Sequence, residues 1–211
     1  MGKAKLSVGI INLNVSNIFS VYEGCLKAGF KTQVIDLKKR KLNYDIIIIP
    51  GVGSFSSGMK FFNENNLADK IDEYLLKPNS FIYGICLGMQ LLFDKSYEFK
   101  KTEGLHLVKG EVRKFKNIKT HITHLGWNKI TLNNNDFKKY FKKFENKYFY
   151  FIHSFYANPD SKKDIFAFSK HGNRNFCSIT KRKNIFGTQF HPEKSGRVGI
   201  EFLKNLKYIK N

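Results

Sequence analysis

The sequence predicts an α/β fold, with an open, mixed and mainly parallel sheet flanked by helices and with antiparallel strands in the C-terminal half. Strand-like and helix-like segments alternate over residues 5–94, which is typical of parallel strands joined by right-handed crossovers. The runs DIIIIP (45–50) and SFIYGIC (80–86) are continuously apolar, as expected for strands that are buried on both faces. After residue 100 the chain changes to short strand-like runs separated by turns.

The N-terminal elements follow one another closely. Apolar residues between positions 16 and 29 recur at helical spacing, and Gly29 marks the end of that helix. The segment NLADKIDEYLLK has the same spacing and predicts a second amphipathic helix. In chain order, we expect a strand at 5–11, a helix at 16–29, strands at 31–37 and 45–50, a helix at 66–77, a strand at 80–86 and a helix that begins at Leu87.

Short strand-like runs dominate the second half of the chain. We expect them to extend the same sheet in antiparallel or mixed order. The segment FKKYFKKF predicts a short helix capped by NNND at 133–136, and residues 196–209 predict a closing helix. Because the chain shows no repeat, linker or low-complexity tail, we expect one domain over residues 1–211. The strand-like runs are KGEVRKFKN, NKITL, KYFYFIHSFY, DIFAFSK, NFCSITK and NIFGTQF.

The composition favours a protein without nucleic-acid or membrane partners. The net charge is +20, but only five of the 37 basic residues are arginine, and lysine is the weaker residue for bidentate phosphate contacts. No run approaches the roughly 20 apolar residues of a membrane span, and the N-terminus lacks a signal-peptide cleavage pattern, so we expect a cytoplasmic protein. Three widely spaced cysteines predict neither a disulfide framework nor a zinc site, and we expect no metal and no cofactor.

The motif GICLG at 84–88 follows a buried strand and precedes a helix. This is the setting of a nucleophile elbow, in which small residues on both sides allow a sharp turn. The turn places Cys86 at the N-terminus of the helix, where the helix dipole favours a thiolate. The alternative is an ordinary strand–turn–helix connection with a buried cysteine, and the motif alone does not separate the two.

A base and its orienting group are found in the segment FGTQFHPEKSG at 186–196. Pro192 holds His191 in an extended conformation. Glu193 lies two residues further on, the same-side spacing of an extended chain, so its carboxylate can reach one imidazole nitrogen. The other nitrogen is then free for Cys86, which predicts a Cys86–His191–Glu193 catalytic triad.

The segment PGVGSF at 50–55 lies at the carboxyl end of a buried strand, the edge at which open α/β sheets bind ligands. The backbone N–H groups of Gly51, Val52 and Gly53, together with that of Leu87, are candidates for an oxyanion hole. A phosphate-binding P-loop is excluded because no Lys-Ser/Thr pair follows the glycines.

Five segments together resemble the class I glutamine amidotransferases, a flavodoxin-like family, and within it the glutaminase subunits of imidazole glycerol phosphate synthases. The similarity covers nearly the whole chain, in order. PGVGSF is more specific than the triad, since related amidotransferases usually have G-G-P there and His in place of Met89. The segments are PGVGSFSSGM, GICLGMQLLF, HLGWN, YFYFIHSFY and FGTQFHPEKSG.

The resemblance implies a reaction at the triad. Cys86 would attack the carboxamide of glutamine, and His191 would pass a proton to the leaving ammonia, after which a glutamyl thioester is hydrolysed. In this family the strand around Val52 is expected to change conformation when the partner is loaded. The resemblance assigns glutamine binding to Gln90, His153, Ser154 and Phe155.

The resemblance also implies a partner chain. A single glutaminase domain accounts for all 211 residues and leaves nothing for a synthase that consumes the ammonia. The expected partner is a (β/α)8-barrel cyclase subunit, which forms a heterodimer, receives ammonia through a channel and makes imidazole glycerol phosphate and AICAR in histidine biosynthesis. Candidate contact residues are Trp127, Asn128, Tyr150 and Lys194.

Two positions depart from the family pattern. Thr123 stands where relatives usually have Pro before the His of H-x-G-W-N, and Leu13-Asn14 replaces a frequent Tyr-Gly pair; Asn14 tolerates a positive φ better than most residues. These departures keep open a paralogous glutaminase subunit that supplies ammonia to another acceptor, such as a surface-sugar amidination system. A third hypothesis is a non-catalytic basic binding module.

Overall fold

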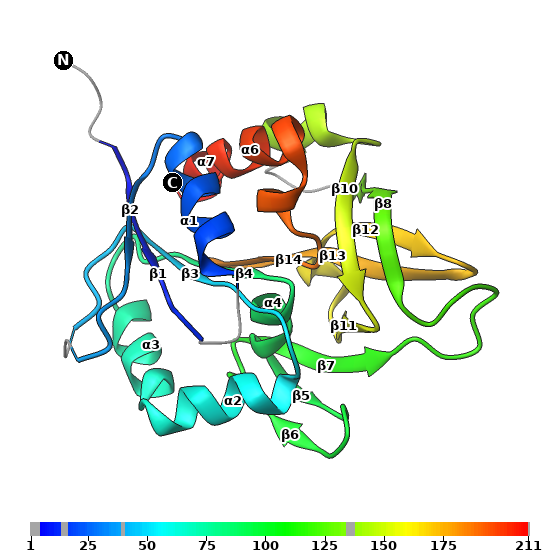
Figure 1. Cartoon of the computed structure of the whole chain (residues 1–211), viewed down its shortest axis with the longest axis horizontal. Coiled ribbons are helices and arrows are strands. Elements are labelled where there is room, and N and C mark those ends of the chain that lie inside the picture. The colour runs from blue at the N-terminus through cyan, green and yellow to red at the C-terminus, as the bar shows by residue number, and fades with distance from the viewer. Residues whose placement is uncertain (1–4, 14–16, 39–40, 134–137, 211) are drawn as a thin grey trace.

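A central sheet organises the computed structural model, which describes residues 5–13, 17–38, 41–133 and 138–210 (Figure 1). In this part of the chain the sheet has eight strands in the order β2-β1-β3-β4-β14-β13-β12-β9. The first five strands run parallel, and β13, β12 and β9 continue the sheet in antiparallel order, which confirms the predicted fold class. The bounds are β1 (Ser7–Ile10), β2 (Lys31–Val34), β3 (Ile46–Ile49), β4 (Ile82–Ile85), β9 (Thr131–Leu132), β12 (Ile165–His171), β13 (Arg174–Arg182) and β14 (Ile185–Thr188).

Helices cover both faces of the sheet, so β3 is buried on each side. Ile46 and Ile48 belong to one apolar cluster with residues of α1 and α6, whereas Ile47 and Ile49 belong to a second cluster with residues of α2 and α3. This division follows from the alternation of side chains along a strand and explains the continuous IIII run. The helices are α1 (Ile18–Lys27), α2 (Phe55–Glu64), α3 (Leu67–Leu75), α4 (Leu87–Leu91), α5 (Lys138–Phe141), α6 (Gly196–Lys204) and α7 (Lys207–Lys210).

Helix α2 was not predicted from the sequence. The segment GVGSFSSG has the composition of a loop, but Ser54 is the N-cap of α2, and its hydroxyl accepts a hydrogen bond from the Ser57 N–H at 3.2 Å. Phe55, Met59 and Phe62 then place one apolar face of the helix in the core. The helix after Cys86 is also shorter than LGMQLLF suggests, because α4 ends at Leu91 and a strand follows.

The sequence predicts that the C-terminal strands extend the central sheet, but only some of them do. In the described residues, β8 and β10 form a two-stranded sheet, and β11, β7, β5 and β6 form a four-stranded sheet. The run KYFYFIHSFY divides at Ser154, so β10 pairs with β8 while β11 pairs with β7. The bounds are β5 (Phe93–Ser96), β6 (Thr102–Glu103), β7 (Val108–Lys114), β8 (His124–Lys129), β10 (Tyr148–His153) and β11 (Phe155–Pro159), and three 3-10 helices are η1 (Lys142–Phe144), η2 (Lys162–Asp164) and η3 (Pro192–Lys194).

The closing helix is divided at Asn205, between α6 and α7. Two expectations fall outside the described residues, namely the cap by positions 134–136 and the substitution of Gly by Asn14. None of the described helices has the length and apolar character that a membrane crossing requires.

Candidate functional site

Cys86 lies on a sharp turn between β4 and α4, as the nucleophile-elbow motif predicts. Its φ and ψ are 53° and −107°, a conformation that costs a non-glycine residue about 1–3 kcal/mol. A Cβ at Gly84 would lie 2.6 Å from the Gly88 carbonyl oxygen, and a Cβ at Gly88 would lie 1.7 Å from the carbonyl oxygen of Ile49. Both glycines are therefore required, although Gly88 is crowded by β3 rather than by Gly84.

His191 and Glu193 form the pair that the sequence predicts. His191 is extended, with φ −100° and ψ 95°, and its Nδ1 lies 2.7 Å from Oε1 of Glu193. The local structure differs from the expectation, because Pro192–Lys194 is the 3-10 helix η3 and not an extended chain. The turn brings the carboxylate back to the imidazole, and both side chains are almost completely buried.

The electrostatic environment favours a protonated His191. Burial lowers the pKa of His191, but the negative charge of Cys86 and the hydrogen-bonded carboxylate of Glu193 outweigh burial and raise it to about 10. The Nε2 atom makes no hydrogen bond to another described residue. A positively charged imidazole near a cysteine is the environment in which cysteine nucleophiles are found.

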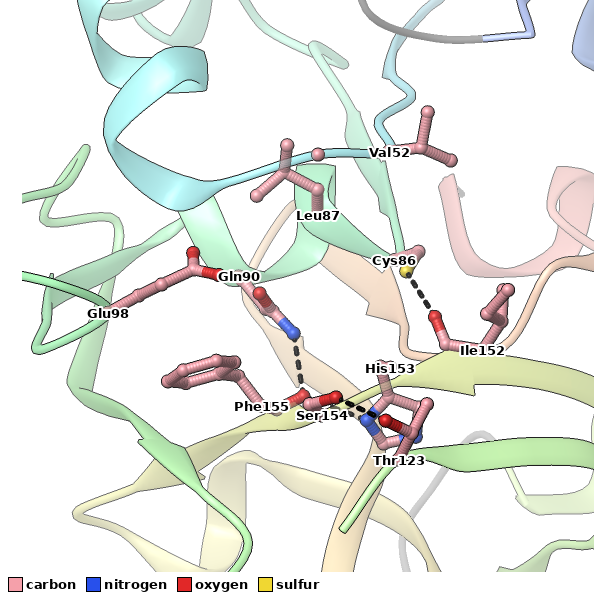
Figure 2. A pocket seen from close by; sticks show the side chains of 11 residues that line it. Val52, Cys86, Leu87, Gln90, Glu98, Thr123, Ile152, His153, Ser154 and Phe155 are labelled. Carbon is pink, nitrogen blue, oxygen red and sulfur yellow. Dashed lines mark hydrogen bonds between the residues drawn. The ribbon is translucent and has the colours of Figure 1, made fainter.

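A cavity of about 340 Å³ opens in front of Cys86 at the carboxyl ends of β3 and β4 (Figure 2). Most of the predicted site residues meet there, and the volume suits a small molecule. Gly51, His191 and Glu193 do not line this cavity; they lie around a much smaller one of about 10 Å³. The main cavity is lined by Val52, Gly53, Cys86, Leu87, Gln90, Glu98, Thr123, Ile152, His153, Ser154 and Phe155.

The predicted oxyanion hole is closed in this structure. The Leu87 N–H, one of its expected donors, gives its hydrogen bond to the carbonyl oxygen of Gly51, at an N–O distance of 3.4 Å. Gly51 and Gly53 give the 51–53 segment the backbone freedom to rotate a peptide group, and Gly53 has a φ of 109°. For the Leu87 N–H to bind an oxyanion, its hydrogen bond to the Gly51 carbonyl oxygen must first break.

The expected glutamine-binding residues have intramolecular partners. Gln90 Nε2 donates to the carbonyl oxygen of Phe155 at 2.8 Å, and the hydroxyls of Ser154 and Thr123 lie 2.9 Å apart (Figure 2). Both ring nitrogens of His153 are engaged, Nδ1 with the Phe155 carbonyl at 2.8 Å and Nε2 with His124. His153 therefore borders the cavity without a free nitrogen for a ligand.

The sequence did not assign Glu98, Thr123, Ile152 or Gln189 to the site, although the first three line the cavity. Glu98 lines the cavity, and its carboxylate accepts a hydrogen bond from the Phe55 N–H at the start of α2, at 2.7 Å. Nothing in the surrounding sequence indicates this position. Gln189 donates from Nε2 to Cys86 Sγ at 3.7 Å, and here a signal existed, because Gln189 precedes His191 by two residues in the same run.

The predicted contact residues do not share one surface. In the β8–β10 sheet, Trp127 pairs with Tyr150, and their rings meet edge to face at 5.9 Å on the outer side. Asn128 lies on the opposite, inner side and donates to His124. Lys194 is exposed on η3. The outer side of this sheet also presents exposed apolar side chains from Leu125, Tyr148 and Ile152.

Comparisons with known proteins agree with this geometry. The family model "Glutamine amidotransferase class-I" matches residues 10–209. The chain is 38% identical to the imidazole glycerol phosphate synthase subunit HisH of Carboxydothermus hydrogenoformans, over 94% of this chain and 97% of that protein. It is 37% identical to the HisH subunit of Methanocaldococcus jannaschii, again over 94% of this chain and 97% of the relative.

Solved structures share the fold at lower sequence identity. The structure of PurLQS from Thermotoga maritima superposes with a TM-score of 0.72 at 20% identity, covering 98% of this chain and 100% of that one. The glutaminase domain of Trypanosoma brucei CTPS superposes with a TM-score of 0.61 at 17% identity, covering 97% and 94% of the two chains.

Proposed function

The chain belongs to the class I glutamine amidotransferase family, as a HisH-type glutaminase subunit that supplies ammonia for imidazole glycerol phosphate in histidine biosynthesis, and from this premise we propose how its residues share the reaction. The observation that carries the proposal is the arrangement around Cys86. The thiol ends a strained turn at the glutamine-sized cavity, and its charge raises the pKa of a histidine that is itself held by Glu193 at 2.7 Å.

Cys86 is the proposed nucleophile. Its thiolate attacks the carboxamide carbon of glutamine, and the imidazolium of His191 gives its proton to the departing nitrogen, so that ammonia leaves and a glutamyl thioester remains. Neutral His191 then takes a proton from a water molecule that attacks the thioester, which releases glutamate and regenerates the thiolate. Glu193 keeps the imidazole oriented and stabilises its charged form.

The cavity supplies groups for the rest of the substrate. Glu98 contributes a carboxylate to the cavity wall and suits the α-ammonium group of glutamine. Gln90, Ser154 and Phe155 also line the cavity, and His153 acts through Phe155. The N–H groups of Leu87 and of the 51–53 segment bind the oxyanion once the Gly51 carbonyl has moved away.

The partner that receives the ammonia is proposed to be a (β/α)8-barrel cyclase, with which the chain forms a heterodimer. The outer side of the β8–β10 sheet is the proposed contact surface, because Leu125, Trp127 and Ile152 on it are large, apolar and exposed. The Ile152 carbonyl lies 3.9 Å from Cys86 Sγ, so this sheet also borders the place where ammonia is released. Tyr150 belongs to the same surface.

We also propose that residues 1–211 form one domain, which the match over residues 10–209 supports. The proposed location is the cytoplasm, because a reducing compartment preserves a free catalytic thiol and all three cysteines are unpaired.

Glutaminase assays of the purified complex test the proposal. The wild-type complex is expected to form glutamate from glutamine, and Cys86→Ala is expected to lower kcat by at least about 10³-fold. With ammonia added in place of glutamine, the Cys86→Ala complex should still make imidazole glycerol phosphate, which controls for folding and assembly. Glutaminase activity that survives Cys86→Ala would overturn the assignment.

Complementation tests the pathway. Expression of this chain should restore growth of a histidine auxotroph that lacks its own glutaminase subunit, whereas Cys86→Ala should not. If a folded chain fails to complement but supports amidination of a surface sugar, the paralogous function is correct.

A further inference from the structure

Two buried histidines, His124 and His153, and the half-buried Asn128 form one continuous run of hydrogen bonds beside the glutamine cavity. Asn128 Nδ2 lies 3.0 Å from Nε2 of His124, and Nδ1 of His124 lies 3.0 Å from Nε2 of His153. Nδ1 of His153 in turn lies 2.8 Å from the carbonyl oxygen of Phe155. The run therefore connects the inner side of β8 to a residue that lines the cavity.

The protein fixes the direction of this run. The amide of Asn128 is held by two backbone groups, since Nδ2 donates to the Lys170 carbonyl at 2.8 Å and Oδ1 accepts from the Lys129 N–H at 2.8 Å. A carbonyl can only accept and an N–H can only donate, so Nδ2 faces His124 as a donor. His124 must then carry its proton on Nδ1, and His153 likewise, because each Nε2 accepts.

With one proton on Nδ1, each imidazole is neutral, and burial of both rings favours the neutral form. His124 and His153 are 5% and 7% exposed. Burial, reinforced by neighbouring His171, lowers the pKa of His124 to about 4, and burial with neighbouring His124 holds the pKa of His153 well below its ordinary value.

Ring packing constrains the plane of the His124 imidazole. His171 stacks on it with a centroid distance of 4.4 Å and an interplanar angle of 28°, and Phe151 stacks at 4.7 Å and 27°. His171 itself is outside the run, because its Nε2 bonds to the carbonyl oxygen of His121 at 2.9 Å. These stacking contacts constrain the plane of the His124 ring, and its two hydrogen bonds determine where its nitrogens point.

At its other end the run reaches the nucleophile. The Phe155 carbonyl also accepts from Gln90 Nε2 at 2.8 Å, and this nitrogen donates as well to Gln189 Oε1 at 3.1 Å. Gln189 then donates from Nε2 to Cys86 Sγ at 3.7 Å. Phe155 and Gln90 both line the cavity, so their positions determine its shape.

We propose that Asn128, His124 and His153 are positioning residues, which hold the Phe155 carbonyl and Gln90 in register for glutamine through one directed run of hydrogen bonds. The run starts at Asn128, the neighbour of Trp127 on the strand proposed to contact the partner. A displacement of β8 on docking is thereby transmitted to the glutamine cavity. This inference rests on the proposed glutaminase function.

Substitutions in the assembled complex test the inference. His124→Phe keeps a ring between His171 and Phe151 but removes both hydrogen bonds, and Asn128→Asp keeps the size but replaces the donor with acceptors. We expect each to raise KM for glutamine about tenfold with a smaller change in kcat, since ground-state positioning is lost. His124→Asn, which can still donate to His153, should recover part of the loss. The matched control His171→Phe keeps the stack and the run, and should change KM less than about twofold.

Two further readouts separate positioning from folding. Synthesis driven by added ammonia should stay at the wild-type rate in every variant, because it bypasses the glutamine cavity. Nitrogen NMR of the wild-type chain should show both His124 and His153 protonated on Nδ1 at neutral pH, a measurement that needs no variant.

The outcomes are distinguishable. A wild-type KM in both His124→Phe and Asn128→Asp, or an Nε2-protonated His124, overturns the inference. A wild-type complex that lacks glutaminase activity overturns the proposed function instead.

Discussion

The backbone N–H of Leu87 donates a hydrogen bond to the carbonyl oxygen of Gly51 at 3.4 Å, which closes the proposed oxyanion hole beside Cys86, the proposed nucleophile. The structure thus combines an assembled His191–Glu193 pair with an unavailable oxyanion donor. Attack on an amide under these conditions would leave the developing negative charge without its preorganised partner.

We therefore expect the isolated chain to be a poor glutaminase. Removal of one oxyanion donor costs about 10²–10³-fold in kcat, and binding of the proposed cyclase partner with its ligand should restore about that factor when the Gly51 carbonyl moves. Glutamate production by the chain alone, with the cyclase, and with the cyclase and its ligand measures the effect. Full activity of the chain alone would show that the Leu87–Gly51 bond does not limit the reaction.

Gly88 should tolerate no side chain. A Cβ there would lie 1.7 Å from the backbone oxygen of Ile49, so Gly88→Ala is expected to lower the free energy of unfolding by at least about 3 kcal/mol or to prevent folding. Gly58→Ala is the control, because its Cβ would meet only the flexible end of Leu91 at 2.9 Å. Urea unfolding of the two variants should differ clearly, and equal stabilities would contradict the packing.

Glu193→Gln should impair catalysis while preserving the fold. The amide cannot stabilise an imidazolium as the carboxylate does at 2.7 Å, so the pKa of His191 should fall and kcat should drop by about 10²–10⁴-fold. KM for glutamine should change little, because Glu193 does not line the glutamine cavity. An unchanged kcat, measured over a range of pH, would remove Glu193 from the triad.

Stability should fall on acidification below about pH 6.5. In the folded chain burial, aided by His171, lowers the pKa of His124 to about 4, so between the two values the unfolded chain binds more protons and unfolding is favoured. From His124 alone, the free energy of unfolding should be about 2 kcal/mol lower at pH 5 than at pH 8. His153, with a pKa shifted in the same direction, adds to this loss.

Urea titrations at both pH values measure this effect, with His124→Asn as the comparison. The variant should lose a smaller part of its stability on acidification, and an identical loss in both proteins would contradict the assigned shift. His191 acts in the opposite direction between pH 6.5 and pH 8, because its raised pKa makes stability fall as pH increases toward 10. This contribution is the same in the wild type and in His124→Asn, so it cancels when the two pH dependences are compared.

The sequence predicted the parts of the site that depend on short segments. Cys86 between two glycines, and His191 followed by Glu193, are each contained within a few residues, and local geometry determines what they do. The parallel half of the sheet was predictable for a similar reason, since the IIII run requires burial on both faces.

Features that depend on tertiary contacts were not predictable. Glu98 is held at the cavity because its carboxylate accepts a hydrogen bond from the first residue of α2. The serine-rich sequence of this helix is more typical of a loop. The division of β10 from β11 at Ser154 depends on which strand each half pairs with.

The opposite positions of Trp127 and Asn128 are, by contrast, predictable from the sequence, because adjacent residues in a strand point to opposite faces of the sheet.

The three cysteines should differ in their reactivity toward alkylating reagents. Burial, with a contribution from Glu193, raises the pKa of Cys25 to about 12, and burial also raises the pKa of Cys177, so both thiols stay protonated and slow to alkylate at neutral pH. Cys86 borders the glutamine cavity beside a protonated histidine. Iodoacetamide should therefore add a single group per native chain, detectable by mass spectrometry. The fraction of chains so labelled counts the competent molecules in any preparation, which allows rates to be expressed per working active site.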